Sequence, residues 1–272
     1  APTPGQSNTN STNQGLDTKT LLLFTSGRLA NNDPLAMLLG AKALKPEKSK
    51  NLSLGFTWKT PAGFSGSVDV YDIKVSDRFS TSAAFAVPAR LCYPRGYTCV
   101  SYFTHDFDAT TRGIDIVGSH LSRIGDGKLN LTLAYNYNTT KVDGGNSSLV
   151  TNPAQRQVFE ERLPRQKATI SGSYDLGSWN TLARVRYYGA WTDNSGNAMV
   201  DIFQRFGAMQ FLDLAASYKI SDKQSVRVGV DNVLDKYPDE ATFQASRGLI
   251  YSRNAPYDTD GRNLYVEYKV KF

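Results

Sequence analysis

The stretch Leu264-Tyr265-Val266-Glu267-Tyr268-Lys269-Val270-Lys271-Phe272 closes the chain and decides its fold class. Apolar or aromatic residues occupy every second position from Leu264 to Phe272, and charged residues such as Glu267 and Lys269 lie between them. A period of two is the spacing of a β-strand with one apolar and one polar face. We interpret this stretch as a strand that ends in an aromatic residue.

The same alternation recurs along the chain from about Ser49 onward. The clearest case is Leu129–Tyr137, where apolar side chains alternate with Asn130, Thr132 and Asn136. Counting such segments predicts about nine strands. They are Leu52–Trp58, Val68–Ile73, Thr111–Leu121, Leu129–Tyr137, Ala168–Tyr174, Ala183–Trp191, Leu212–Ile220, Val226–Val230 and Leu264–Phe272.

The connections between these segments alternate between short turns and long loops. The short ones are Thr60–Gly63, Arg123–Gly127, Asp175–Ser178 and Ser221–Lys223, and the long ones are about Ser80–Thr104, Lys141–Leu163, Thr192–Ala208 and Asp235–Asp260. Outer-membrane barrels have this regularity, whereas Greek-key sandwiches do not. The sequence has no run of roughly 18 apolar residues that would predict a membrane helix. We therefore predict an all-β fold, an antiparallel transmembrane β-barrel in the bacterial outer membrane.

The direction of the strands follows from the C-terminus. If Phe272 lies at the periplasmic end, every long loop lies outside the cell. Aromatic residues at the strand ends fit two interfacial girdles on the apolar face. The outer girdle would hold Tyr135, Tyr137, Tyr187 and Trp191, and the inner one Trp58, Tyr174, Tyr218 and Phe272.

An odd number of strands does not close a bacterial barrel, because closed single-chain barrels have an even count. Either one strand near Thr18–Leu29 escapes the pattern, or earlier strands belong to a region outside this chain. We expect the second, so that the chain holds the C-terminal strands of a larger barrel. Residues 1–47 would form a polar tail and an extracellular loop, and residues 48–272 the strands with their long loops.

The long loop before residue 104 carries the candidate ligand-binding residues. They are Arg90, Tyr93, Arg95, Tyr97, Tyr102 and Phe103, because rigid aromatic side chains bind flat ligands with little loss of entropy. Packing of the loop on its neighbours explains the same residues equally well. Cys92 and Cys99 are close enough in sequence for a local disulfide, which would persist in an oxidising compartment, and two free thiols are the alternative.

Basic side chains on the polar face form a second candidate site. Arg184, Arg186 and Arg227 would face the lumen, where they attract anionic ligands or neutralise nearby acids. The formal charge of +6 does not indicate nucleic-acid binding, because the cations are spread over strand faces rather than clustered with stacking aromatics.

The sequence gives little support for a catalytic or metal-binding site. His105 and His120 are the two available imidazoles, and no nucleophile motif accompanies either. Cys92, Cys99 and His105 would offer a metal three ligands at unsuitable spacing. Asp193–Asn197 and Asp258–Gly261 are rich in oxygen ligands, but neither completes a calcium-loop pattern. We predict no catalytic site, metal or cofactor.

Four segments resemble TonB-dependent outer-membrane receptors. Ala43–Gly55 resembles their L-K-P-E-x-S-x-N-x-x-x-G segment, and Val228–Pro238 is similar to their G-x-x-N-L-F-D-K-x-Y segment. Asp69–Arg78 and Thr111–Asp115 look like two of the strands that lie between them.

The resemblance implies a barrel of about 22 strands with an N-terminal plug. Such a receptor imports a scarce nutrient with energy relayed through the TonB complex, and we expect a ferric siderophore or another iron chelate here. The plug that contacts TonB is absent from this chain, so we expect no coupled transport by the chain alone. Further expected partners are outer-membrane lipid, lipopolysaccharide and the barrel-assembly machinery, which would recognise Tyr268, Val270 and Phe272. A passive porin and a non-transport barrel, either a hydrolase or an adhesin, are the alternatives.

Overall fold

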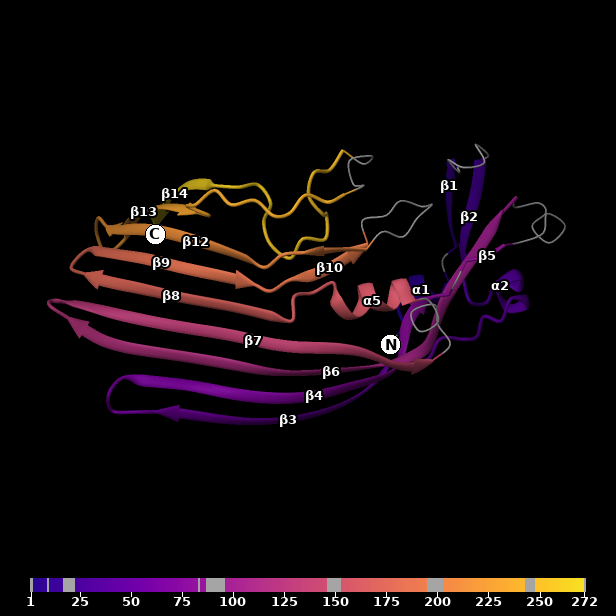
Figure 1. Cartoon of the computed structure of the whole chain (residues 1–272), viewed down its shortest axis with the longest axis horizontal. Helices are drawn as coiled ribbons and strands as arrows, with labels where there is room; N and C mark the ends of the chain where they lie inside the picture. The colour runs from indigo at the N-terminus through magenta and orange to yellow at the C-terminus, as the bar shows by residue number, and fades with distance from the viewer. Residues whose placement is uncertain are drawn as a thin grey trace.

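Nine strands form one antiparallel sheet in which neighbours follow chain order. The computed structural model describes residues 2–8, 10–16, 23–82, 84–86, 96–145, 153–194, 203–242 and 248–271. The nine strands are β3 (Lys48–Lys59), β4 (Phe64–Thr81), β6 (Cys99–Ile124), β7 (Gly127–Gly145), β8 (Gln166–Leu176), β9 (Trp179–Tyr188), β12 (Met209–Lys219), β13 (Gln224–Asp231) and β14 (Asn263–Val270). Figure 1 shows them side by side, with tight turns at one end and long connections at the other. We call these the turn end and the loop end.

The turns lie where the sequence predicted them. Residues 60–63, 125–126, 177–178 and 220–223 join consecutive strands. Gly63, Gly125 and Gly177 have positive φ values of 82°, 57° and 57°, a backbone conformation that glycine adopts without steric cost. The predicted alternation of short and long connections is therefore confirmed.

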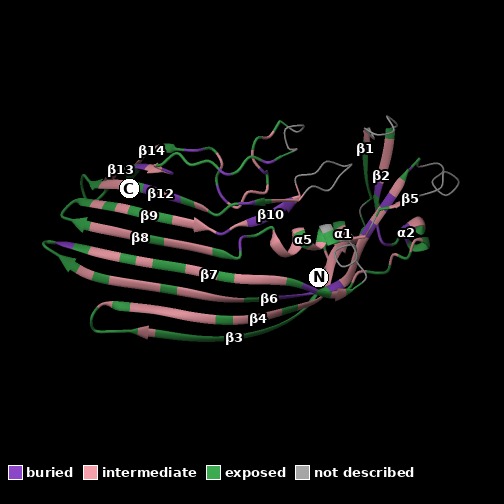
Figure 2. Ribbon diagram, in the orientation of Figure 1, coloured by how far each residue is buried: buried purple, intermediate pink, exposed green. Residues whose placement is uncertain are grey.

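One face of the sheet is apolar and exposed, and we call it the apolar face. Leu54, Val70, Ile114 and Tyr137 lie directly opposite one another across four strands and so point to the same side. Even on the central strand β8, Ile170 is 55% exposed. A continuous exposed apolar surface of this extent is unusual for a protein surrounded by water. Figure 2 shows β3 exposed along almost its whole length, whereas exposed and half-buried positions alternate along β9.

The opposite, polar face is crossed by hydrogen bonds between side chains of neighbouring strands. The hydroxyls of Ser65 and Ser119 lie 2.7 Å apart, and those of Thr132 and Ser171 2.6 Å apart. Such pairs satisfy polar groups that the strand period places on this side, and they confirm the face assignments made from the alternation.

Three strands, β4, β6 and β7, extend well beyond their predicted lengths at the loop end. β6 runs over 26 residues, whereas the alternation indicated only Thr111–Leu121. Its first residues pair with β5 (Phe85–Ala86) and, in parallel, with β2 (Leu23–Leu29), which in turn pairs with β1 (Ser11–Leu16). This pairing holds the first residues of β6, which show no clear alternation, in an extended conformation. Figure 1 shows β1, β2, β5 and the start of β6 bending away from the sheet of nine strands.

The segment 1–47, expected as a polar tail and an extracellular loop, contains short regular elements. Among its described residues are α1 (Pro4–Asn8) and β1. β1 is a strand because β2 supplies its hydrogen-bond partners, which is tertiary information that a polar sequence does not display. Asp33 caps the N-terminus of α2 (Pro34–Leu38): its carboxylate accepts a hydrogen bond from the Leu35 backbone N–H at 2.9 Å.

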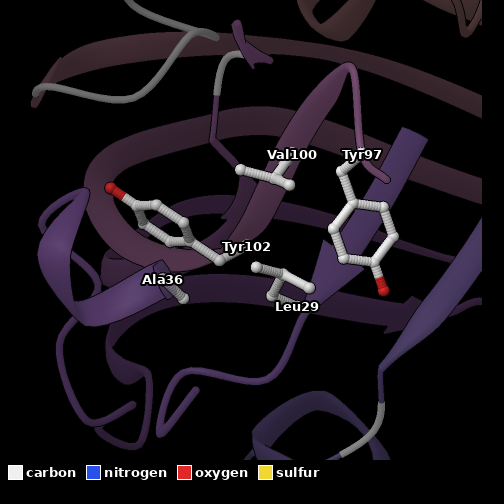
Figure 3. Close-up of a cluster of buried hydrophobic side chains, with 5 residues drawn as sticks. All are labelled: Leu29, Ala36, Tyr97, Val100 and Tyr102. Carbon is white, nitrogen blue, oxygen red and sulfur yellow. The ribbon is translucent and has the colours of Figure 1, made fainter. Parts of the chain in front are cut away.

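The buried apolar residues gather at the loop end rather than between sheets. One cluster holds Leu29, Ala36, Tyr97, Val100 and Tyr102 (Figure 3), which come from β2, α2, the residues just before β6 and the start of β6. A second lies under α5 (Pro153–Glu161), where Phe159 meets Phe107, Ala109 and Val142. The loop connections therefore have cores of their own.

Three of the aromatic residues expected at the outer strand ends lie elsewhere: β7 continues to Gly145, so Tyr135 and Tyr137 are in its middle, and Trp191 is outside the nine strands. It lies in β10 (Trp191–Asn194), is 2% exposed and stacks on Phe206 of β11 (Phe203–Phe206) at 4.5 Å. β9 ends at Tyr188, so the predicted continuation of that strand through Trp191 was wrong. Trp179, 54% exposed beside Tyr218, adds an aromatic at the turn end that sequence reading missed. Phe272 lies outside the described residues.

The sheet is open, because β3 and β14 each have one unpaired edge within the described part of the chain. None of the helices described is both long and apolar enough to cross a membrane.

Candidate functional site

Asp213 organises a group of charged side chains on the polar face near the loop end. Its carboxylate accepts from Arg184 Nε at 2.8 Å and from Arg186 Nε at 2.7 Å and Nη2 at 2.9 Å. Arg184 also reaches Asp231 at 3.4 Å. Asp213 is 3% exposed, so its charge is neutralised by the two arginines rather than by solvent. Both arginines lie on the polar face, and their charge is largely matched by acids on the same face; that this face lines a lumen stays a prediction.

The segment that resembles the G-x-x-N-L-F-D-K-x-Y motif ends β13 and forms the turn that follows it. Asn232 has a positive φ of 53° and is 4% exposed. Its backbone N–H donates to Asp213 at 2.9 Å, and its side chain bonds both the N–H and the carbonyl of Lys236. Asp235, with φ also 53°, accepts from the Arg262 amide at 2.9 Å. These contacts tie both ends of the β13–β14 connection to the sheet.

Asp193 of β10 joins three connections. It is fully buried and accepts from Ser252 Oγ at 2.9 Å and Asn254 Nδ2 at 2.8 Å, both in the β13–β14 connection. Arg162, which follows α5 in the β7–β8 connection, donates to it at 3.3 Å. We call Arg162, Asp193, Ser252 and Asn254 the loop hub. The hub makes the three connections one packed unit.

Aromatic residues link this unit to the strands. Trp191 Nε1 donates to the Tyr257 hydroxyl at 3.2 Å, and the Tyr257 ring lies 5.5 Å from that of Phe211. The guanidinium of Arg186 lies 5.1 Å from the same Phe211 ring. Burial raises the pKa of Tyr257 above its ordinary value. Arg186, which bonds Asp213, is thus linked through the rings of Phe211 and Tyr257 to Trp191 in the loops.

A second site lies at the loop-end half of β6. A cavity of about 280 Å³ is lined by Gly40, Lys42, Asp77, Tyr102, Phe103, Thr104, His105 and Asp106. Among the candidate ligand residues, Tyr102 and Phe103 line it, whereas Tyr97 packs 8% exposed in the neighbouring cluster. The Tyr102 hydroxyl donates to the Leu39 carbonyl at 2.8 Å. Packing therefore accounts for most of the Tyr97 and Tyr102 surfaces, and ligand binding by this group stays a prediction.

The rest of that loop is outside the described residues, which include none of Arg90, Cys92, Tyr93 and Arg95. Cys99 opens β6 as a free, half-buried cysteine in the described part of the chain, so the disulfide stays a prediction.

The remaining basic and histidine candidates have ordinary structural neighbours. Arg227 lies opposite Glu267, and its guanidinium is 5.9 Å from the Tyr265 ring. His120 stacks on Phe64 at 3.9 Å, away from the charged group around Asp213. Within the described ranges, no three His, Cys, Asp or Glu side chains gather as a metal site would require. Tyr268 and Val270 are exposed on β14.

A family model described as "TonB dependent receptor-like, beta-barrel" matches residues 1–233. The chain belongs to this family. TonB-dependent receptors lie in the bacterial outer membrane and are not enzymes, which agrees with the predicted fold class and location. No match was found among curated proteins.

Solved TonB-dependent receptors and transporters have the same fold. The ferripyoverdine receptor of the outer membrane of Pseudomonas aeruginosa is 18% identical, with a TM-score of 0.55 over 85% of this chain and 28% of its own. The FrpB iron transporter from Neisseria meningitidis is 16% identical, with a TM-score of 0.58 over 84% and 32%. The copper transporter OprC is 20% identical, with a TM-score of 0.55 over 84% and 32%. The chain thus spans about a third of the length of these structures, and at these identities the likeness shows the fold alone.

Proposed function

We propose that this chain forms part of the barrel wall and the external loops of a TonB-dependent receptor that imports a scarce nutrient. The substrate class we propose is a ferric siderophore or another iron chelate. The observation that carries the proposal is the loop hub, because it packs three connections into one unit directly above the charged residues of the polar face. A rigid set of loops at the mouth of a barrel can capture a large ligand at low entropic cost.

In this proposal the polar face lines the lumen and the apolar face contacts lipid. The turn end lies in the periplasm and the loop end outside the cell, as in other outer-membrane barrels. The open sheet and the coverage of about a third of related structures support a barrel of about 22 strands, with the remaining wall and the plug supplied from outside this chain. TonB would act through that plug, and the barrel-assembly machinery through the end of β14.

The substrate proposal draws on the neighbours, which include an iron transporter and a ferripyoverdine receptor. A copper transporter is also among them, so copper is the second substrate to test. The exposed part of Phe103, the cavity beside it and the arginines of the polar face are the surfaces we propose for ligand contact.

The test expresses the complete gene under iron limitation and measures uptake of ferric chelates, and separately of copper, with and without TonB. Uptake of a chelate that requires TonB supports the proposal. Uptake that proceeds equally without TonB would instead indicate a passive porin, and copper-restricted uptake would correct the substrate.

A further inference from the structure

The cavity at the loop end of β6 holds more acidic than basic side chains. Asp77 and Asp106 line it together with one lysine, Lys42. No ion pair in the described part of the chain includes any of these three residues. Two carboxylates against one ammonium leave the cavity with an excess of negative charge, so it favours a cation over an anion.

The hydroxyl groups at the cavity wall already use their hydrogen atoms. Tyr102 donates to the Leu39 carbonyl at 2.8 Å, and Thr104 donates to Asp106 at 2.6 Å. A hydroxyl has one hydrogen to donate, so both groups can only accept from a ligand. The imidazole of His105, which also lines the cavity, presents an acceptor nitrogen in either neutral tautomer. The wall therefore suits a ligand group that donates hydrogen bonds.

Asn31 lies directly behind this wall and adds a further acceptor. Its side-chain Nδ2 donates to the carbonyls of Lys42 and Phe103, each at 2.7 Å, and both of those residues line the cavity. Asn31 is 6% exposed, and its Oδ1 is buried with no hydrogen-bond partner among the described residues. A buried acceptor without a donor is unfavourable, so this side of the cavity is also short of donors.

A β-bulge in β4 brings Asp77 to the cavity. The register of β4 against β6 shifts between Val75 and Arg78, and Asp77 has a positive φ of 56°. Its backbone N–H donates to Asp108 at 3.1 Å instead of joining the ladder. Bulges of this kind redirect a side chain out of the strand alternation. Arg78, the next residue, lies 5.2 Å from the Phe159 ring and does not line the cavity, so it does not neutralise Asp77 there.

We propose that this cavity binds a primary ammonium group carried by the imported chelate. An ammonium group is compact, has three hydrogens to donate and accepts none, which complements a wall of acceptors. Asp77 and Asp106 would give it charge-assisted hydrogen bonds, and the ring of Phe103 offers a face to a cation. The volume of about 280 Å³ accommodates the group with a short alkyl stem. The inference rests on the proposed function only in assigning the ammonium group to the imported chelate.

The test uses the purified complete receptor in a non-ionic detergent and two soluble probes. Nα-acetyl-lysine methylamide carries one primary ammonium group, and its Nε-acetylated form is neutral. Saturation-transfer NMR titrations measure the affinity of the receptor for each. The acid variant combines Asp77→Asn with Asp106→Asn. The matched control combines Asp126→Asn with Asp222→Asn, which removes the same charge from exposed positions at the turn end.

We expect the wild type and the control to bind the ammonium probe about tenfold or more tightly than the neutral probe, as hydrogen bonds to charged groups allow. The acid variant should lose this preference. Lys42→Gln keeps both acids and removes the positive charge beside them, so it should bind the ammonium probe about twofold to fivefold more tightly than the wild type. This third variant tests the charge of the cavity even if the acid variant fails to fold.

Equal binding of the two probes by the wild type would overturn the inference, as would an acid variant that keeps the preference or a control that loses it. Weaker binding of the ammonium probe by Lys42→Gln would overturn it too. Calcium is added in a further arm, and complete displacement of the probe by calcium would assign the cavity to a metal ion instead. Binding is measured without TonB, so TonB-independent uptake would refute the transport proposal while leaving this result unaffected.

Discussion

Arg162 donates to the fully buried carboxylate of Asp193 over 3.3 Å and so joins the β7–β8 connection to β10. Arg162 is itself 45% exposed, so the ion pair contributes little through charge alone. The larger contribution comes from the hydrogen bonds that satisfy a buried carboxylate. This makes Asp193 the residue on which the loop unit most depends.

Asp193→Asn should loosen the three connections without affecting the strands. The amide cannot accept from all three donors of the loop hub, and we expect a cost of about 2 kcal/mol. Hydrogen exchange should rise in the described parts of residues 146–165, 189–208 and 232–262 and stay unchanged in β7 and β8. Asp260→Asn, at an exposed loop position, is the control; equal exchange in both variants would refute the role of Asp193.

Asp213→Ala should destabilise the sheet at the loop end by about 3 kcal/mol, because it leaves Arg186 and the Asn232 amide without their buried acceptor. We expect the complete barrel to unfold at a lower temperature, as followed by its mobility in detergent gels after heating. Glu267→Gln removes an acid that is 42% exposed, and should change that temperature little. A smaller effect for Asp213→Ala than for this control would contradict the assignment.

Gly229→Ala should interfere with β13–β14 packing, because a β-carbon at Gly229 would overlap the ring of Tyr265. Overpacking of this kind costs about 1 to 3 kcal/mol. Gly118→Ala in β6 is the matched control, since open space surrounds that position. The yield of folded barrel in the outer membrane should fall for the first variant and not for the second.

Tyr257 should ionise at higher pH than an exposed tyrosine, since burial disfavours the phenolate. Its pKa is raised above the ordinary 10.0, so the neutral form stabilises the folded loops fully below about pH 10 and this stabilisation is lost as the pH rises through the folded pKa. The difference in phenolate absorbance between wild type and Tyr257→Phe should show a late titration. A difference curve centred at or below pH 10 would contradict it.

Cys92 and Cys99 should resist alkylation in protein prepared without reductant, if the predicted disulfide forms in the periplasm. Intact mass then shows neither thiol labelled, and labelling appears after reduction. Labelling of both thiols without reductant would establish the free-thiol alternative.

The local patterns of the sequence predicted the strands of the sheet and the short turns between them. A strand period is a local property, so Leu129–Tyr137 reveals both faces of β7 without reference to any neighbour. The turns were equally visible, because Gly63 and Gly125 supply backbone conformations that few other residues adopt. Arg184 and Arg186 were placed on the correct face by the same reasoning.

The partners of those residues depend on register and on contacts distant in sequence. Asp213 alternates like any polar strand residue, and only the pairing of β9 with β12 brings it to Arg184. The short strands β1 and β10, the burial of Trp191 and the loop hub likewise arise where connections pack on one another. By itself the sequence determined the strands and their faces, since both follow from backbone geometry over a few residues. Only the tertiary structure decided which charges are neutralised and which loops pack together, because those free energies come from residues brought together by folding.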